Sequence, residues 1–201
     1  MRLTLLIAAL MLASASVLPD TAKSGEADNP STGKCAFDRE AMLTLDFNAF
    51  DQGFDGGWRA VAKDEDCTLI AADLIREYID RHESDETIIV FHEGQMRAKG
   101  GQTARAIELM LSTREPDGQN SYFGWNFYID ATIAFLEKDK QRLIEARDAL
   151  AALPKPGSFR AVDRDGKPVE MQWPPNMSVV NGFVDCFEES YAVAYRECSG
   201  L

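Results

Sequence analysis

Runs of residues with helical periodicity, separated by short turns, constrain the fold of this chain more than any other feature. Apolar residues recur at intervals of three and four, and glycine, proline or a tight turn divides the runs. Helices joined by such short turns pack as antiparallel pairs, so we expect a mainly α fold with three helix pairs. The expected helices cover approximately residues 38–50, 66–81, 87–99, 102–113, 125–138 and 141–153.

The pattern changes after residue 153. Segment 158–173 contains two short runs of strand-forming residues around Asp165-Gly166, a dipeptide typical of a two-residue hairpin turn. Because an isolated hairpin is only marginally stable in water, we expect it to pack on the helices. After two consecutive prolines, Asn176 is expected to cap a last helix that runs to about Glu197.

Small residues recur at an offset of forty positions, since Gly94 is followed by Ala134 and Ala106 by Ala146. Small residues at the crossing of two helices joined by a turn resemble the tetratricopeptide repeat. The resemblance covers about residues 88–153 and implies a short stack of helix pairs with a concave face, of the kind that binds peptides. The aromatic residues of that family are mostly missing here, so the resemblance concerns architecture alone.

The N-terminus has the composition of an export signal, because Arg2 precedes a short apolar stretch and then small residues suited to cleavage. We therefore expect a signal peptide at 1–15, a flexible leader at 16–34 and a single domain at 35–201. No later stretch is long and apolar enough to cross a bilayer. The expected location is the periplasm or the outside of the cell.

All four cysteines lie in the expected mature part, and an even number predicts two disulfides in an oxidising compartment. Cys186 and Cys198 fall in the expected last helix, where twelve residues span roughly 18 Å, beyond the reach of a disulfide. Unless that helix breaks, both must pair with Cys35 and Cys67, which would join the last helix to the first helix pair.

The formal net charge is −12 at pH 7. An acidic chain of this kind is a poor candidate for binding nucleic acid or anionic lipid. The charge suits a basic protein partner, but it is also an ordinary route to solubility, and the sequence leaves both explanations open. The sequence has no nucleophile or nucleotide motif, and His82 and His92 are not at metal-ligand spacing, so we expect no cofactor and no metal.

Polar residues concentrate on the expected helix at 87–99, where His92, Glu93, Gln95 and Arg97 lie close together in sequence. Glu93 and Arg97 stand four residues apart, the spacing of a helix-surface ion pair worth ~0.3–0.5 kcal/mol. One interpretation is a solvated helix face. The alternative is a polar patch on the concave side of the stack.

Asn126 and Asp130 lie one turn apart on the expected helix at 125–138 and share a face. Asn126 is explained either by capping or a buried structural hydrogen bond, or by a ligand that its amide faces together with the Asp130 carboxylate. The candidate binding site consists of His92, Gln95, Arg97, Asn126 and Asp130.

These observations predict an exported, non-enzymatic binding protein that recognises another envelope polypeptide through the concave face of its helical stack. The repeat-like stack and the lack of a catalytic motif favour binding. A second hypothesis is an envelope glycan hydrolase with His92 or Glu93 and Asp130 as acid and base, which requires a cleft with a carboxyl group of raised pKa. The third is a purely structural protein with neither pocket nor partner.

Overall fold

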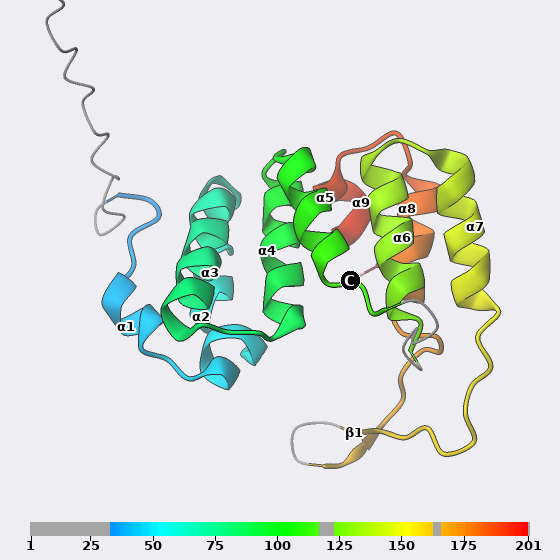
Figure 1. Cartoon of the computed structure of the whole chain (residues 1–201), viewed down its shortest axis with the longest axis horizontal. Helices are drawn as coiled ribbons and strands as arrows, with labels where there is room; N and C mark the ends of the chain where they lie inside the picture. Colours follow the sequence, from blue (N-terminus) through cyan, green and yellow to red (C-terminus); the bar gives the residue numbers. More distant parts are fainter. Residues whose placement is uncertain (1–32, 117–122, 163–165, 201) are drawn as a thin grey trace, which may run out of the picture.

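The computed structural model describes residues 33–116, 123–162 and 166–200 (Figure 1). The expected signal peptide, most of the expected leader and Asp165 of the expected hairpin turn lie outside these residues. In the described part of the chain, no helix has the length and apolar character needed to cross a membrane.

The described residues form helices and one small sheet. The longer helices begin and end as follows: Thr68–His82 (α3), Thr87–Lys99 (α4), Thr103–Ser112 (α5), Trp125–Leu136 (α6), Lys140–Ala151 (α7) and Met177–Asp185 (α8). The short elements are Arg39–Leu43 (α1), the π-helix Asn48–Gln52 (η1), Gly57–Val61 (α2), the 3₁₀ turn Glu65–Cys67 (η2), Ala161–Val162 (β1), Pro168–Val169 (β2) and Tyr191–Arg196 (α9).

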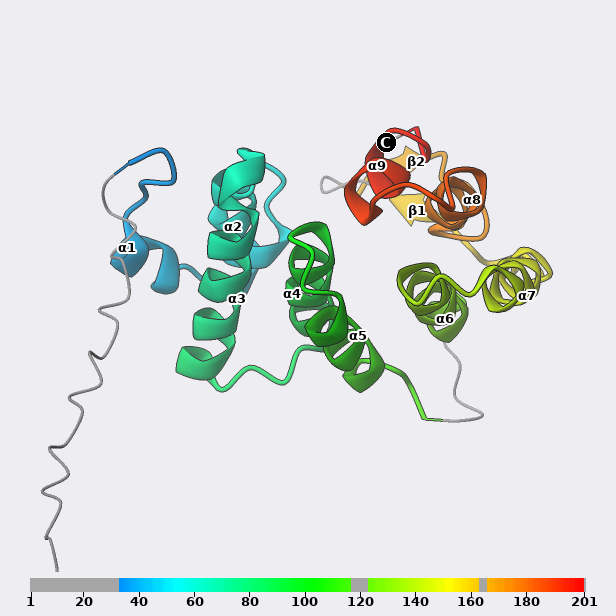
Figure 2. The same ribbon diagram turned by 90° about the horizontal axis from the view of Figure 1, so that it is seen from above.

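The expected mainly α fold of packed antiparallel helix pairs is confirmed. In Figure 2, the pairs α2/α3, α4/α5 and α6/α7 follow one another, and α8 and α9 lie against one side of the stack. The close packing of α4 on α5 depends on Gly94, because a Cβ there would lie 3.1 Å from Met110 Cγ and 3.4 Å from the Ala106 carbonyl oxygen. The arrangement is compatible with a helical-repeat architecture.

Buried apolar side chains form two clusters that meet at α4. The N-terminal cluster includes Phe50 and Ile75 and takes Ile89 from α4. The C-terminal cluster takes Phe91 from α4 and is built around the phenylalanines of α6 and α8, among them Phe135. Burial of these side chains is the main force that holds the helix pairs together. Because α4 contributes a buried side chain to each cluster, it joins the two halves of the molecule.

The first expected helix, 38–50, is interrupted. Asp38 caps α1 as expected, since its side chain accepts from the Ala41 N–H at 3.0 Å, but α1 ends at Leu43. Two residues before η1, the Asp46 carboxylate accepts from the Ala49 N–H at 2.9 Å. A carboxylate that caps a new turn competes with continuation of the helix, which explains the break.

The expected last helix also breaks. Asn176 occupies the position before α8, although its side chain makes no capping hydrogen bond. The helix α8 ends before Cys186, and Ser190 starts α9 by accepting from the Val193 N–H at 3.3 Å. Ser is a favoured first residue of a helix, so this serine is the sequence signal for the break.

The disulfide prediction is wrong because of that break. Cys186 and Cys198 pair with each other, with their Cα atoms 6.3 Å apart, and Cys35 pairs with Cys67. Each disulfide therefore lies within one half of the molecule. Two disulfides fit an extracellular or periplasmic protein.

The expected hairpin is present within 158–173, with Ala161 opposite Val169 and Val162 opposite Pro168. Its strands do not become buried against the helices as expected, and they remain largely exposed. The residue that attaches this end to the helices is Trp173, whose indole N–H donates to the Leu153 carbonyl at 2.9 Å.

Candidate functional site

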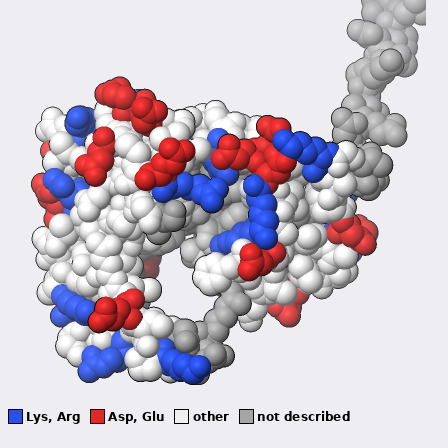
Figure 3. Space-filling model, turned by 180° about the vertical axis from the view of Figure 1, so that it is seen from behind, with Lys and Arg blue, Asp and Glu red and all other residues white. Residues whose placement is uncertain are grey.

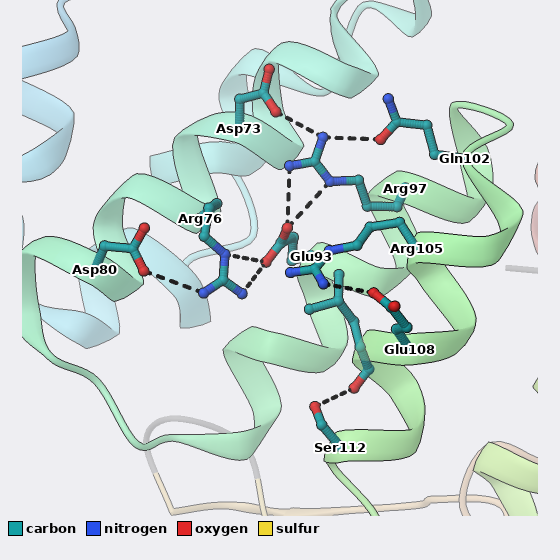
Figure 4. A network of polar contacts seen from close by, with 10 residues as sticks. Asp73, Arg76, Asp80, Glu93, Arg97, Gln102, Arg105, Glu108 and Ser112 are labelled. Atoms are coloured by element: carbon teal, nitrogen blue, oxygen red, sulfur yellow. Dashed lines mark hydrogen bonds and ion pairs between the residues drawn. The ribbon is translucent and has the colours of Figure 1, made fainter.

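Glu93 does not lie on a solvated helix face, which was one of the two interpretations of the polar residues at 92–97. Its carboxylate is fully buried between α3 and α4, where it accepts from Arg76 Nε at 2.9 Å and from Arg97 Nε at 3.2 Å (Figure 4). The expected ion pair between Glu93 and Arg97 is present at 3.2 Å, but it is buried and does not lie on the helix surface. The periodicity of α4 could not reveal the second arginine, because Arg76 comes from another helix.

Arg97 belongs to the same network. Its guanidinium also contacts the Asp73 carboxylate at 2.7 Å and the Gln102 side-chain oxygen at 3.1 Å, and only 11% of its side chain is exposed. Arg76 likewise reaches Asp80 at 3.3 Å. Charged side chains with several partners in fixed positions cross-link α3 to α4. Arg97 is thus engaged within the fold.

His92 turns away from this network toward the segment before α2. Its Nδ1 donates to the Asp51 carboxylate, at 2.8 Å from Oδ1, and the Trp58 indole N–H donates to the same oxygen at 2.8 Å. Arg59 lies beside them, with its Cζ 4.1 Å from the centre of the Trp58 ring and a hydrogen bond to the Asp51 carbonyl.

Burial acts to raise the pKa of the Asp51 carboxyl, but the hydrogen bond and charge of His92, the Trp58 hydrogen bond and the Arg59 charge together hold that pKa below its ordinary value. Asp51 therefore remains an anion at neutral pH, and it orients His92 through Nδ1. The other ring nitrogen, Nε2, makes no hydrogen bond within the described residues. Chemically, His92 is fixed in orientation and retains one nitrogen for a hydrogen bond.

Gln95 lies under α9. It is only 8% exposed, and its amide donates to the Tyr128 hydroxyl at 3.3 Å. Tyr191 of α9 also lies close to this amide, and among the described residues its buried hydroxyl has no hydrogen-bond partner. Burial raises the pKa of the Tyr128 and Tyr191 hydroxyls well above the ordinary value. The chain's own C-terminal helix thus covers this part of α4.

Asn126 makes a buried structural hydrogen-bond pair, one of the two explanations considered for it. Its Oδ1 accepts from the Glu115 N–H at 2.9 Å, and its Nδ2 donates to the Glu115 carbonyl at 3.0 Å. Asp130 forms an ion pair with Arg114. Burial raises the pKa of the Asp130 carboxyl, and the Arg114 and Arg142 charges only partly oppose this effect.

The five candidate residues thus have separate partners. No hydrogen bond or ion pair of the described residues joins His92 to Asp130, the acid–base pair that a glycan hydrolase would need. The raised pKa of Asp130 fits such a role, but its carboxylate is engaged by Arg114.

A pocket that the sequence did not indicate opens where α3 meets the turn to α4. Its volume is about 490 Å³. It is lined by Thr44, Leu45, Asp46, Phe47, Tyr78, His82, Glu83, Ser84, Asp85 and Glu86. We call it the acidic pocket, because four of these side chains are carboxylates.

The aromatic wall of the acidic pocket is formed by stacked rings. Tyr78 stacks between Phe50 and His82, with ring centres 3.8 Å and 4.1 Å away, and its hydroxyl donates to the Leu45 carbonyl at 3.0 Å. Burial first, and then the negative charges of Asp46 and Asp51, raise the pKa of this hydroxyl. The phenol proton is therefore held, and the negative charge of the pocket comes from its carboxylates.

Within the described residues, none of the four carboxylates of the acidic pocket forms an ion pair. By contrast, most arginines in the described part of the chain form an ion pair with an acidic residue. Within the same residues, no group of three or more His, Cys, Asp or Glu side chains is arranged to hold a metal ion. Negative charge spread around an aromatic wall suits an extended organic cation, which can contact both.

Comparison of the chain with protein-family models, with curated proteins and with solved structures finds no match.

Proposed function

We propose that this chain is an exported, non-enzymatic binding protein that recognises a basic segment of another envelope polypeptide in the acidic pocket. The observation that carries the proposal is the pocket of about 490 Å³, which is lined by aromatic side chains and by four carboxylates. Within the described residues, none of these carboxylates, Asp46, Glu83, Asp85 and Glu86, forms an ion pair. A lysine or arginine side chain is the cation that a polypeptide supplies.

The chemistry of such a guest fits the two kinds of lining residue. The apolar stem of a lysine or arginine packs along Phe47 and Tyr78, and its charged end reaches the carboxylates at the rim. Bringing a cation between like charges also relieves their mutual repulsion. The net charge of −12 adds long-range attraction, which raises the rate of encounter with a basic partner.

The acidic pocket replaces the inner face of α4 as the proposed place of binding. Gln95 on that face is covered by α9, and Arg97 is engaged by Glu93 and Asp73. Of the five residues singled out in the sequence, His92 keeps a ring nitrogen without a hydrogen bond within the described residues, but it does not line the acidic pocket.

Two variants with the same net charge test the proposal. The pocket variant combines Glu83→Gln, Asp85→Asn and Glu86→Gln. The control variant changes three exposed carboxylates at the other end of the chain, Glu188→Gln, Glu189→Gln and Glu197→Gln. None of the three forms an ion pair with another residue that the structure describes. Both lose three negative charges, so only the position of the charges differs.

The oxidised native protein and both variants are titrated with a lysine-rich peptide of alternating lysine and alanine and, as a reference, its glutamate counterpart. We expect the pocket variant to bind the lysine peptide about tenfold more weakly, a change of ~1.4 kcal/mol, and the control variant to bind it as the native protein does. Equal losses in both variants would show that net charge alone attracts the peptide. No loss in either would place the binding elsewhere.

Envelope extract passed over the three immobilised proteins then identifies the natural partner. The expected partner is a basic polypeptide that the native and control columns retain and the pocket column does not.

A further inference from the structure

Exposed apolar side chains gather at the hairpin end of the molecule. Val162, Val169, Met171 and Phe123 are 56%, 44%, 50% and 47% exposed, and they are four of the six large apolar side chains exposed in the described residues. Scattered apolar residues are normal on a protein surface, but a concentration at one end is typical of a contact surface. Figure 3 shows this end standing apart from the helices above it, with basic and acidic side chains side by side on its surface.

Both faces of the hairpin carry an exposed apolar side chain. Val162 pairs with Pro168 and Ala161 with Val169, and residues directly opposite share a face while neighbours alternate. Val162 and Val169 therefore point to opposite faces, and both are exposed. Strands this short are marginal without a further strand or a helix against them.

The hairpin is nevertheless fixed at its base. Phe123, Phe159 and Trp173 form an aromatic cluster with ring centres 4.8 to 6.1 Å apart, and Trp173 is bonded to the Leu153 carbonyl. The cluster joins the flanks of both strands to the segments before α6 and after α7. The aromatic cluster therefore holds the two strands in place before any partner binds, so that a further strand could pair with them.

The two outer edges of the hairpin differ. β2 begins with Pro168, which has no N–H to donate, and proline is a common way to protect an edge strand from pairing. β1 has no proline, so its N–H and carbonyl groups can pair with an additional strand. The receptive edge is therefore that of β1.

Positive charge lies next to β1. Arg160 donates to the carbonyls of Gly157 and Phe159, and the Lys155 Nζ lies 5.6 Å from the centre of the Phe159 ring. Neither forms an ion pair within the described residues. In sequence, segment 154–173 has four basic and three acidic residues, a net charge of 4 − 3 = +1, while the whole chain has −12.

We propose that β1 accepts an extended segment of another polypeptide as a third strand, with apolar side chains at alternate positions and a carboxylate beside Arg160 and Lys155. Backbone pairing supplies affinity in such complexes, and the side chains supply specificity. A second copy of this chain is the weaker candidate, because strands of two residues offer far less than the ~1,200 Å² of a standard interface and the two copies would carry like charges.

The probe is a six-residue peptide of alternating valine and glutamate, added to the full oxidised chain. We expect saturable NMR shift changes at the backbone amides of residues 159–162. The same peptide with lysine in place of glutamate is expected to bind about tenfold more weakly, and a version with N-methylated backbone is expected not to bind. A variant that combines Lys155→Glu and Arg160→Glu should prefer the lysine peptide.

A matched variant with Lys63→Glu and Arg105→Glu carries the same change of charge away from the hairpin, and it should keep the native preference. Absence of saturable shifts, equal binding of the N-methylated peptide, or a preference that reverses in both variants would overturn the proposal. Sedimentation of the native chain gives a further outcome: self-association that the hairpin variant abolishes would identify a second copy as the occupant and would also overturn it.

Discussion

Replacing Glu93 by glutamine removes one charge from the centre of the network that joins α3 to α4, and changes the size of the side chain very little. The native carboxylate accepts from Nε and Nη2 of both Arg76 and Arg97, so it receives four charge-assisted hydrogen bonds. In the variant, one oxygen becomes an NH₂ group that faces N–H donors. The contact with one of the two arginines then changes from attraction to repulsion.

The magnitude follows from burial and from the remaining partners. Removing one partner from a buried ion pair typically costs ~3–5 kcal/mol. Here each arginine keeps a second carboxylate, Asp80 for Arg76 and Asp73 for Arg97, and Arg76 is partly exposed to water. We therefore expect Glu93→Gln to lower the free energy of unfolding by about 2–3 kcal/mol, below the usual range for a fully buried pair.

Urea unfolding at pH 7, followed by circular dichroism with both disulfides intact, measures this loss. The control is Glu108→Gln, which breaks an exposed pair with Arg105 and should cost less than ~0.5 kcal/mol. If Glu93→Gln costs no more than the control, the network does not hold the two helices together. A variant with apolar residues at Arg76, Glu93 and Arg97 should recover part of the loss, because no unpaired charge is left buried.

Three further predictions concern other parts of the fold. The Asp51 carboxyl has a lower pKa in the folded than in the unfolded chain, so the stabilisation that it contributes is present above the ordinary value of 3.8 and is lost as the pH falls through the lower folded value. The difference in urea stability between the native protein and Asp51→Asn should therefore narrow as the pH is lowered below about 4. Replacing Cys186 and Cys198 by serine opens a loop of twelve residues and should cost about 3 kcal/mol in the same assay. Gly57→Ala places a Cβ 1.9 Å from a carbonyl oxygen of η1 at a φ of +53°, so it should lower the free energy of unfolding by about 3 kcal/mol or more, or prevent folding. Gly101→Ala has no atom within 4 Å of the new Cβ, so it should cost only about 1 kcal/mol; thermal unfolding measures both.

Local patterns were sufficient to predict most of the helices. The helix α4 begins at Thr87 and ends at Lys99 as expected, because apolar periodicity and two following glycines mark both ends. The breaks at Asp46 and Ser190 were missed, since each lies in a run whose apolar spacing continues past it. Both residues have side chains that cap a new turn, so the signals were present but competed with periodicity.

The candidate site was less predictable, because its contacts join segments far apart in the chain. The spacing of Glu93 and Arg97 gave no indication of Arg76, which comes from α3 and buries the carboxylate. The acidic pocket combines residues 44–47 with 78–86. The charged run at 83–86 was visible in the sequence, but only the packing of α1 and η1 against α3 gives it an aromatic wall.

The order of the disulfides along the chain affects how the protein can mature. A chain that emerges N-terminus first into an oxidising compartment presents Cys35 and Cys67 as its only thiols until more than a hundred further residues have followed. Oxidation at that stage can give only the native bond, and the next two thiols to appear, Cys186 and Cys198, are again native partners. Correct pairing therefore requires no exchange between disulfides. In the interleaved pairing expected from sequence, Cys35 and Cys67 would have had to remain reduced until Cys186 and Cys198 emerged, or to exchange a non-native bond afterwards.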